Sequence, residues 1–196
     1  HLANALQYRQ EVINGIPYKK ALLVSYALFP LKKGRTTVDS LKTKCTVSER
    51  NLFGAGKKYN LRKSSKEIKV KVLPIPNKGR PESYSDAVGV FNITAKIDQK
   101  QVPVNQPVSL KLRIAGRGNA KRIDLPPIDY PQGLELYDVK SESKYNKDGT
   151  SYKEFEVLLI PRQEGEATIP AITFATFNPE THKFVTKTLP PVKLKI

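Results

Sequence analysis

Strict alternation of apolar and polar residues in three short runs limits the folds open to this chain. The runs are VSLKLRI at 108–114, IKVKV at 68–72 and VKLKI at 192–196. Successive side chains of a β-strand point to opposite faces, so each run predicts a strand with one buried face and one wet face. No stretch sustains the 3.6-residue period of a capped helix. The sequence therefore predicts an all-β fold.

Proline and glycine mark where these strands should stop. The pairs at 126–127 and 190–191 place two prolines in succession, which excludes both positions from a central strand. Asn-Gly at 14–15 and Asp-Gly at 148–149 are dipeptides whose backbone tolerates positive φ, so they predict hairpin turns. Turn signals at this spacing are typical of β-sandwiches.

The chain also repeats itself. The stretch ALFPLKKGRTTV at 27–38 matches LLIPRQEGEATI at 158–169 without a gap, which places Gly34 on Gly165. Near the ends, at a slightly smaller shift, IKVKV matches VKLKI and Tyr59 falls on Phe184. The copies differ in loop length, as expected of strands joined by variable turns. The repeat predicts tandem immunoglobulin-like β-sandwich domains.

The repeat divides the chain into two domains. We expect residues 1–75 to be the C-terminal part of a first sandwich, 76–87 a proline-rich linker, and 88–196 a second, complete sandwich. Pro161 lies deep within the second copy, whereas its equivalent Pro30 lies close to the start of the chain. The first domain is therefore expected to be N-terminally truncated by about 44 residues, or about three strands. Methionine is absent even at position 1, which also predicts a chain cut from a longer one.

Positive charge is concentrated in the first half. The formal charge is +16 overall; residues 1–85 hold 18 Lys and Arg against 5 Asp and Glu, and residues 86–196 hold 16 against 13. Such a balance favours acidic proteins, anionic lipid surfaces or nucleic acid as neighbours. The candidate basic interaction surface consists of Lys32, Lys33, Arg35, Lys57, Lys58, Arg62 and Lys63.

Two interpretations of this basic surface remain open beside that of a solvated face without a ligand. One is an acidic protein or an anionic membrane surface. The other is nucleic acid, because GAGKKYNLRKSSK at 54–66 mixes lysines with an aromatic that could stack on a base. The match of Tyr59 to Phe184 indicates an ordinary strand aromatic instead, which disfavours nucleic acid.

Residues for metal binding or nucleophilic catalysis are scarce. The only cysteine is Cys45 and the only histidines are His1 and His182. A zinc site needs three or four ligands, and a histidine-dependent nucleophile needs an imidazole beside it. Glu154 and Glu156 lie two apart and are interpreted as solvated charges of one strand face. We therefore expect no enzyme, no cofactor and no metal.

The glycine-rich AGRGN at 115–119 invites comparison with a phosphate-binding loop. Such a loop needs a strand before it and a helix after it, and the following AKRIDLPP is not expected to open a helix. The stretch is interpreted as a tight strand connection in which Gly116 and Gly118 supply unusual φ values.

Longer phrases of the second copy resemble the BatD family of bacterial aerotolerance, or oxygen tolerance, proteins. They are the G-x-G-N at 116–119, the LPP at 125–127, and the IPRQEG at 160–165 that runs through TIP into FNPET. The linker VLPIPNKGRPESYSDAVGVF adds to the resemblance, which extends from about Asn14 to the end.

This resemblance implies a periplasmic protein with tandem immunoglobulin-like domains, anchored to the inner membrane by a segment outside this chain. It also implies a role beside MoxR-type ATPases and von Willebrand factor A proteins, the latter being the expected partners. The resemblance supplies no catalytic residue. The expected function is thus a non-enzymatic protein-protein interaction module or scaffold, and the alternative is a basic domain that docks on a polyanion.

Overall fold

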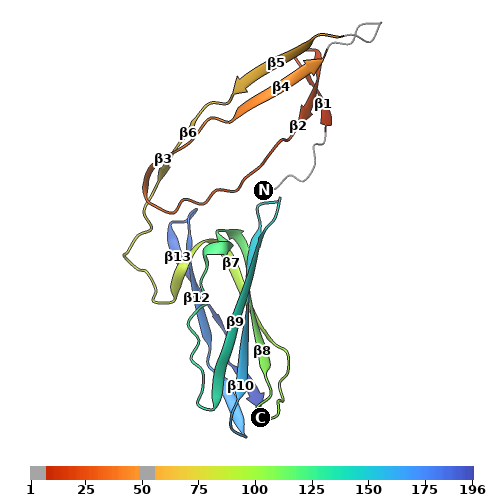
Figure 1. The fold of residues 1–196 in the computed structure, drawn as a ribbon. Coiled ribbons are helices and arrows are strands. Elements are labelled where there is room, and N and C mark those ends of the chain that lie inside the picture. The colour runs from red at the N-terminus through yellow and green to blue at the C-terminus, as the bar shows by residue number, and fades with distance from the viewer. Residues whose placement is uncertain (1–7, 49–55) are drawn as a thin grey trace. The chain divides into compact units, whose positions relative to one another are not determined.

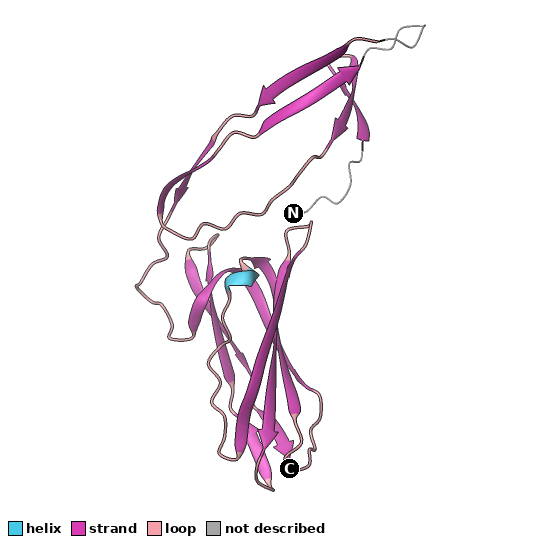
Figure 2. Ribbon diagram, in the orientation of Figure 1, coloured by secondary structure: helices cyan, strands magenta, loops and turns pink. Residues whose placement is uncertain are grey.

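The computed structural model describes residues 8–48 and 56–196, and within these ranges almost all of the regular secondary structure is β-strand (Figures 1 and 2). The early strands are β1 (Tyr8–Ile13), β2 (Ile16–Ala21), β3 (Gly34–Val38), β4 (Lys42–Ser48), β5 (Lys58–Ser64) and β6 (Ile68–Val72). The later ones are β7 (Tyr84–Ile97), β8 (Val108–Gly118), β9 (Leu134–Tyr145), β10 (Ser151–Pro161), β11 (Glu166–Ile169), β12 (Ile172–Asn178), β13 (Lys183–Leu189) and β14 (Val192–Lys195). The predicted all-β fold is confirmed.

The chain divides into two compact units. One comprises residues 28–75, and the other comprises residues 1–27 together with 76–196. β7 begins at Tyr84, inside the stretch that the sequence assigns to the linker 76–87. The division into a truncated and a complete domain stays a prediction.

Both predicted hairpin turns are present. Ile13 pairs with Ile16 across a two-residue turn in which Asn14 and Gly15 have φ of 49° and 80°. β9 and β10 are joined across residues 146–150, where Gly149 has φ of 85°. In both turns the glycine adopts a backbone conformation that costs other residues free energy.

β7 links two sheet segments of the C-terminal part. Its first residues pair in parallel with β12, through Tyr84 opposite Ala175 and Val88 opposite Phe177. From Gly89 onward it pairs antiparallel with β8 instead. The resulting strand order is β13-β12-β7-β8-β10-β9, and β11 and β14 form a separate pair. The two ends of one long strand thereby join the layers of a sandwich.

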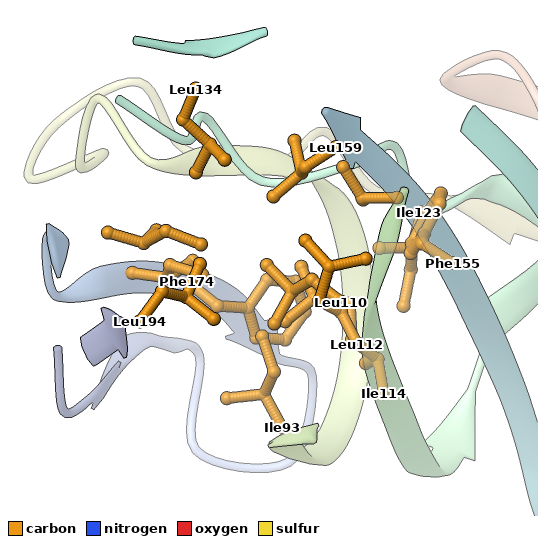
Figure 3. Packing of buried hydrophobic residues seen from close by; sticks show 14 of the residues in the cluster. Ile93, Leu110, Leu112, Ile114, Ile123, Leu134, Phe155, Leu159, Phe174 and Leu194 are labelled. Atoms are coloured by element: carbon orange, nitrogen blue, oxygen red, sulfur yellow. The ribbon is translucent and has the colours of Figure 1, made fainter. Parts of the chain in front are cut away.

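The core lies between these layers (Figure 3). Leu110, Leu112 and Ile114 alternate along β8 and are fully buried, as the pattern VSLKLRI predicts. Phe174 of β12 and Leu194 of β14 pack into the same cluster. The alternation of β8 is thus explained by one face of its sheet meeting the opposite layer.

The switch of β7 between partners depends on close backbone contact with the end of β8. Gly89 lies opposite Gly118, where an added Cβ would stand 2.2 Å from the Val88 carbonyl oxygen. The Asn119 side chain accepts a hydrogen bond from the Val88 amide at 2.8 Å and donates one to the Asp86 carbonyl at 3.0 Å. These contacts fix the point at which β7 leaves β12 and joins β8.

Two details of the glycine-rich stretch differ from the sequence interpretation. Gly116 and Gly118 lie within β8, not in a connection between strands, and only Gly118 has a positive φ, at 152°. Gly116 is required by space, because a Cβ there would lie 2.0 Å from the Val90 carbonyl oxygen. The following residues do open a helical turn, the 3-10 turn η1 (Ala120–Arg122). Ala120 is buried in this turn, so packing against the core stabilises it without a long helical pattern.

Two long hairpins share the same pairing scheme. In the C-terminal part, β11–β12 pairs with β13–β14 in one continuous register, interrupted where Pro170, Pro190 and Pro191 break the ladder. In residues 28–75, β3–β4 pairs with β5–β6 in one register as well. The hairpins begin at the matching glycines Gly34 and Gly165, with φ of 127° and 126°.

The hairpin of residues 34–48 and 58–72, here called the basic ribbon, lacks a buried face. IKVKV forms β6 as predicted, yet Ile68 and Val70 remain 60% and 39% exposed. The prediction that this strand would bury its apolar side is wrong for the described chain. Pattern alone specifies which side is apolar and not whether another strand covers it.

Tyr84 stands at the start of β7 with its hydroxyl buried and without a hydrogen-bond partner among the described residues. The rings of Tyr84 and Phe184 meet edge to face, with their centroids 5.2 Å apart. The guanidinium carbon of Arg80 lies 5.3 Å from the centroid of the Tyr84 ring. Burial, assisted by the charge of Asp86 and opposed by that of Arg80, raises the pKa of Tyr84 to about 12. The folded state therefore favours the neutral phenol.

Replacing Tyr84 with Phe is expected to maintain the free energy of unfolding at pH 7 or raise it by about 1 kcal/mol, because it removes an unsatisfied buried hydroxyl. The unfolded tyrosine ionises near pH 10 while the folded one keeps its proton, so the wild type should lose stability as pH rises from about 10 to about 12. The Phe variant lacks this contribution. Denaturant titrations at pH 8 and pH 11 measure the difference.

The control is Tyr137→Phe, whose ring is 66% exposed and which keeps Tyr84. It should lose stability between pH 8 and pH 11 as the wild type does. Equal losses for the Tyr84 variant and the wild type would contradict the assignment.

Candidate interaction surface

The seven basic residues singled out in the sequence all lie in or beside the basic ribbon. Lys32 and Lys33 precede β3, Arg35 lies on β3, Lys57 precedes β5, and Lys58, Arg62 and Lys63 lie on β5. All seven are exposed. Directly opposed residues of an antiparallel pair point to the same side, so the register decides which of them share a face.

On β3–β6 the basic residues face one side. Arg35 is opposite Lys71 and Thr37 is opposite Lys69, whereas Val38 is opposite Ile68 on the other side. The lysines of β6 therefore join Arg35, although they are not among the seven residues predicted from the sequence. Their alternation within IKVKV was the signal that could have identified them.

On β4–β5 the sides are divided differently. Lys44 is opposite Arg62 and Ser48 is opposite Lys58, which places these cations on one side. Lys63 is opposite Thr43 on the other side, which also carries Cys45, Val47, Tyr59 and Leu61. Lys63 thus does not share a face with its neighbour Arg62.

The positive charge of the basic ribbon and the residues beside it has little internal compensation. Residues 28–48 and 56–75 contain 12 Lys and Arg and 2 Asp and Glu, a difference of +10. Arg35 opposite Lys71 and Lys44 opposite Arg62 are like charges directly across the strands, an arrangement that destabilises an isolated ribbon. The ion pairs of the described residues all lie outside residues 28–75. An anionic neighbour would relieve this repulsion.

The exposed face of the C-terminal sheet contrasts with the ribbon, because its charges are paired across strands. Arg113 of β8 contacts Glu154 of β10 at 2.9 Å, and Lys111 contacts Glu156 at 3.3 Å. A hydrogen bond from Ser109, together with Lys111, lowers the pKa of Glu156. The two glutamates are thus members of a charge lattice and not free surface carboxylates.

The position of Tyr59 differs from the sequence alignment by one residue. Tyr59 is opposite Val47, and the equivalent pair of the C-terminal hairpin is Asn178 opposite Lys183. The register therefore matches Tyr59 to Lys183, not to Phe184. Tyr59 is 44% exposed.

The described ranges contain neither a candidate metal site nor a candidate membrane-spanning helix. No group of three or more His, Cys, Asp or Glu side chains in residues 8–48 and 56–196 could hold a metal ion. The same residues form no helix with the length and apolar character needed to span a membrane.

Comparison with protein families adds a match to the BatD DUF11 like domain over residues 95–196. Neither the curated proteins nor the solved structures provide a significant match. The family match begins within β7 and ends at the last residue, so it covers most of the strands that build the sandwich core. It spans more than half of the sequence. The chain belongs to the BatD family.

Proposed function

We propose that this chain is a non-enzymatic interaction module of a BatD-family protein. It acts in the periplasm, within a complex on the inner membrane, and a segment outside the chain provides the anchor. Its partners are von Willebrand factor A proteins that work with MoxR-type ATPases. The observation that supports the proposal most directly is the family match over residues 95–196.

The surface is compatible with such a role. β9 is the last strand of the six-stranded sheet and pairs with β10 alone among the described strands, and its residues 135–144 are exposed. Exposed strand edges accept strands of partner proteins through backbone hydrogen bonds. Tandem sandwich domains, which the shared hairpin scheme favours, would present several such edges.

Affinity purification of the membrane-anchored protein from gently solubilised native membranes tests this function. We expect von Willebrand factor A proteins to be recovered with it. A chain in which β9 carries Leu136→Lys and Val139→Lys should recover less, since these exposed side chains lie on that strand. Recovery of no such protein with the wild type would overturn the proposal.

The second candidate function is docking on a polyanion, and the charge difference of +10 over residues 28–48 and 56–75 favours it. Binding to anionic vesicles should fall steeply between about 50 and 200 mM salt, because neutralised phosphates release counterions. Exchange of Lys42, Lys44, Lys58 and Arg62 for Gln should weaken binding, whereas Lys140→Gln and Lys144→Gln on β9 should not. Salt-independent binding would exclude this mode.

A further inference from the structure

The basic ribbon leaves apolar side chains exposed at positions whose C-terminal equivalents are buried. Val38 and Val70 are 37% and 39% exposed, whereas Ile169 and Leu194 at the matching positions are 0% and 3% exposed. The apolar side chains of β3 and β6 thus occupy the same positions in their hairpin as those of β11 and β14 do in theirs. In the C-terminal part, Ile169 and Leu194 belong to the core cluster that also contains residues of β7 and β8.

The same contrast appears further along the two hairpins. Leu41 is 52% exposed and its equivalent Ile172 is 2% exposed. Cys45 is exposed, whereas its equivalent Thr176 is 4% exposed. In the C-terminal part β7 runs parallel to β12 beside Ala175 and Phe177, on either side of Thr176. A strand placed in this way along β4 would cover Cys45.

We infer that the basic ribbon is covered by a β-strand from the protein's own sequence upstream of His1, which pairs parallel to β4 as β7 pairs with β12. This inference rests on the proposed tandem organisation. Chain order supports it: β7 and β8 precede the hairpin β9–β10, and the hairpin β1–β2 is the equivalent that precedes the basic ribbon. Strands equivalent to β7 and β8 therefore belong before Tyr8.

Residues 22–31 give independent support. In this stretch Leu22, Leu23 and Leu28 are 55–66% exposed. In the alignment of the two copies Leu28 corresponds to Leu159 of β10, which is fully buried against the core. A strand-like apolar sequence is thus exposed where its counterpart is covered.

Lys63 indicates which kind of side chain the upstream strand should carry. Its equivalent in the second hairpin is Lys187, whose ammonium donates a hydrogen bond to the Asn92 side chain of β7. The upstream strand is therefore expected to offer an oxygen acceptor to Lys63, and apolar side chains at alternate positions to Val38 and Val70. The side with Lys42, Lys44, Lys58 and Arg62 faces away from this cover and remains the surface for an anionic partner.

The lone thiol provides the measurement. Cys45 alkylation by a maleimide is compared in residues 1–196 and in the same protein extended by the segment that its gene encodes upstream, long enough to complete the first sandwich. In residues 1–196 the thiol should react as fast as a Ser141→Cys control in a Cys45→Ser background. In the extended protein it should react at least about tenfold more slowly, approaching a Thr176→Cys control in the same background.

The same measurement distinguishes the upstream strand from three alternatives: no cover, a second copy of the chain, and a separate partner. Equal, fast rates in both proteins would overturn the inference. Protection that grows with protein concentration together with a dimeric mass would assign the cover to a second copy, and protection only after addition of a purified partner would assign it to that partner. Both results contradict the inference. Amide hydrogen exchange at 44–46 gives a second readout that needs no substitution, and recovery of membrane partners is a separate measurement, so the proposed function can fail or hold independently.

Discussion

Alanine at Gly116 is expected to lower the free energy of unfolding of the C-terminal sandwich by about 3 kcal/mol. The backbone at this residue has no positive φ, so strain of the main chain does not contribute. The cost comes from space: the new Cβ would lie 2.0 Å from the Val90 carbonyl oxygen and 2.8 Å from the Phe91 Cα. Both atoms belong to β7, and relief would require β7 and β8 to separate.

Two further glycines separate the steric contribution to the loss of stability from the contribution of a positive φ. Gly118 combines a similar clash with φ of 152°, so its alanine variant should lose about 4 kcal/mol. Gly165 has φ of 126° and no atom within 4 Å of an added Cβ, so Gly165→Ala should lose only about 1–2 kcal/mol. Urea unfolding followed by circular dichroism measures all three. Equal losses would contradict the close approach of β7 and β8.

The sequence was informative wherever a residue type determines the local structure by itself. Asn14-Gly15 predicts its hairpin because few other dipeptides accept two positive φ values, and Pro190-Pro191 predicts a break because proline donates no ladder hydrogen bond. The alternation of VSLKLRI predicts which side of β8 is buried. These are local rules, so they need no knowledge of neighbouring strands.

Long-range pairing was not accessible to such rules. That β7 exchanges β12 for β8 depends on contact between Gly89 and Gly118, which are far apart in sequence. Within the basic ribbon, the sequence identified Arg62 and Lys63 as neighbours, but the register places them on opposite sides. Composition predicts that a region is basic, whereas only strand pairing determines which charges share a face.

Ile172→Ala and Leu41→Ala form a matched pair that measures how much the missing cover matters. Ile172 is 2% exposed within the core, so its truncation should cost about 3 kcal/mol through lost burial and a residual cavity. Leu41 occupies the equivalent position of the basic ribbon and is 52% exposed, so the same truncation in residues 1–196 should change the free energy of unfolding by less than about 0.5 kcal/mol.

The comparison becomes decisive in the upstream-extended protein. If a strand there covers the ribbon as β7 covers β12, Leu41 is removed from water and Leu41→Ala should cost about 2–3 kcal/mol, while the cost of Ile172→Ala stays unchanged. Thermal and urea unfolding of the four variants, two in each chain length, provide the values. A Leu41 variant without effect at either length would mean that this leucine remains in solvent. The apolar side of the basic ribbon would then be a surface for another molecule.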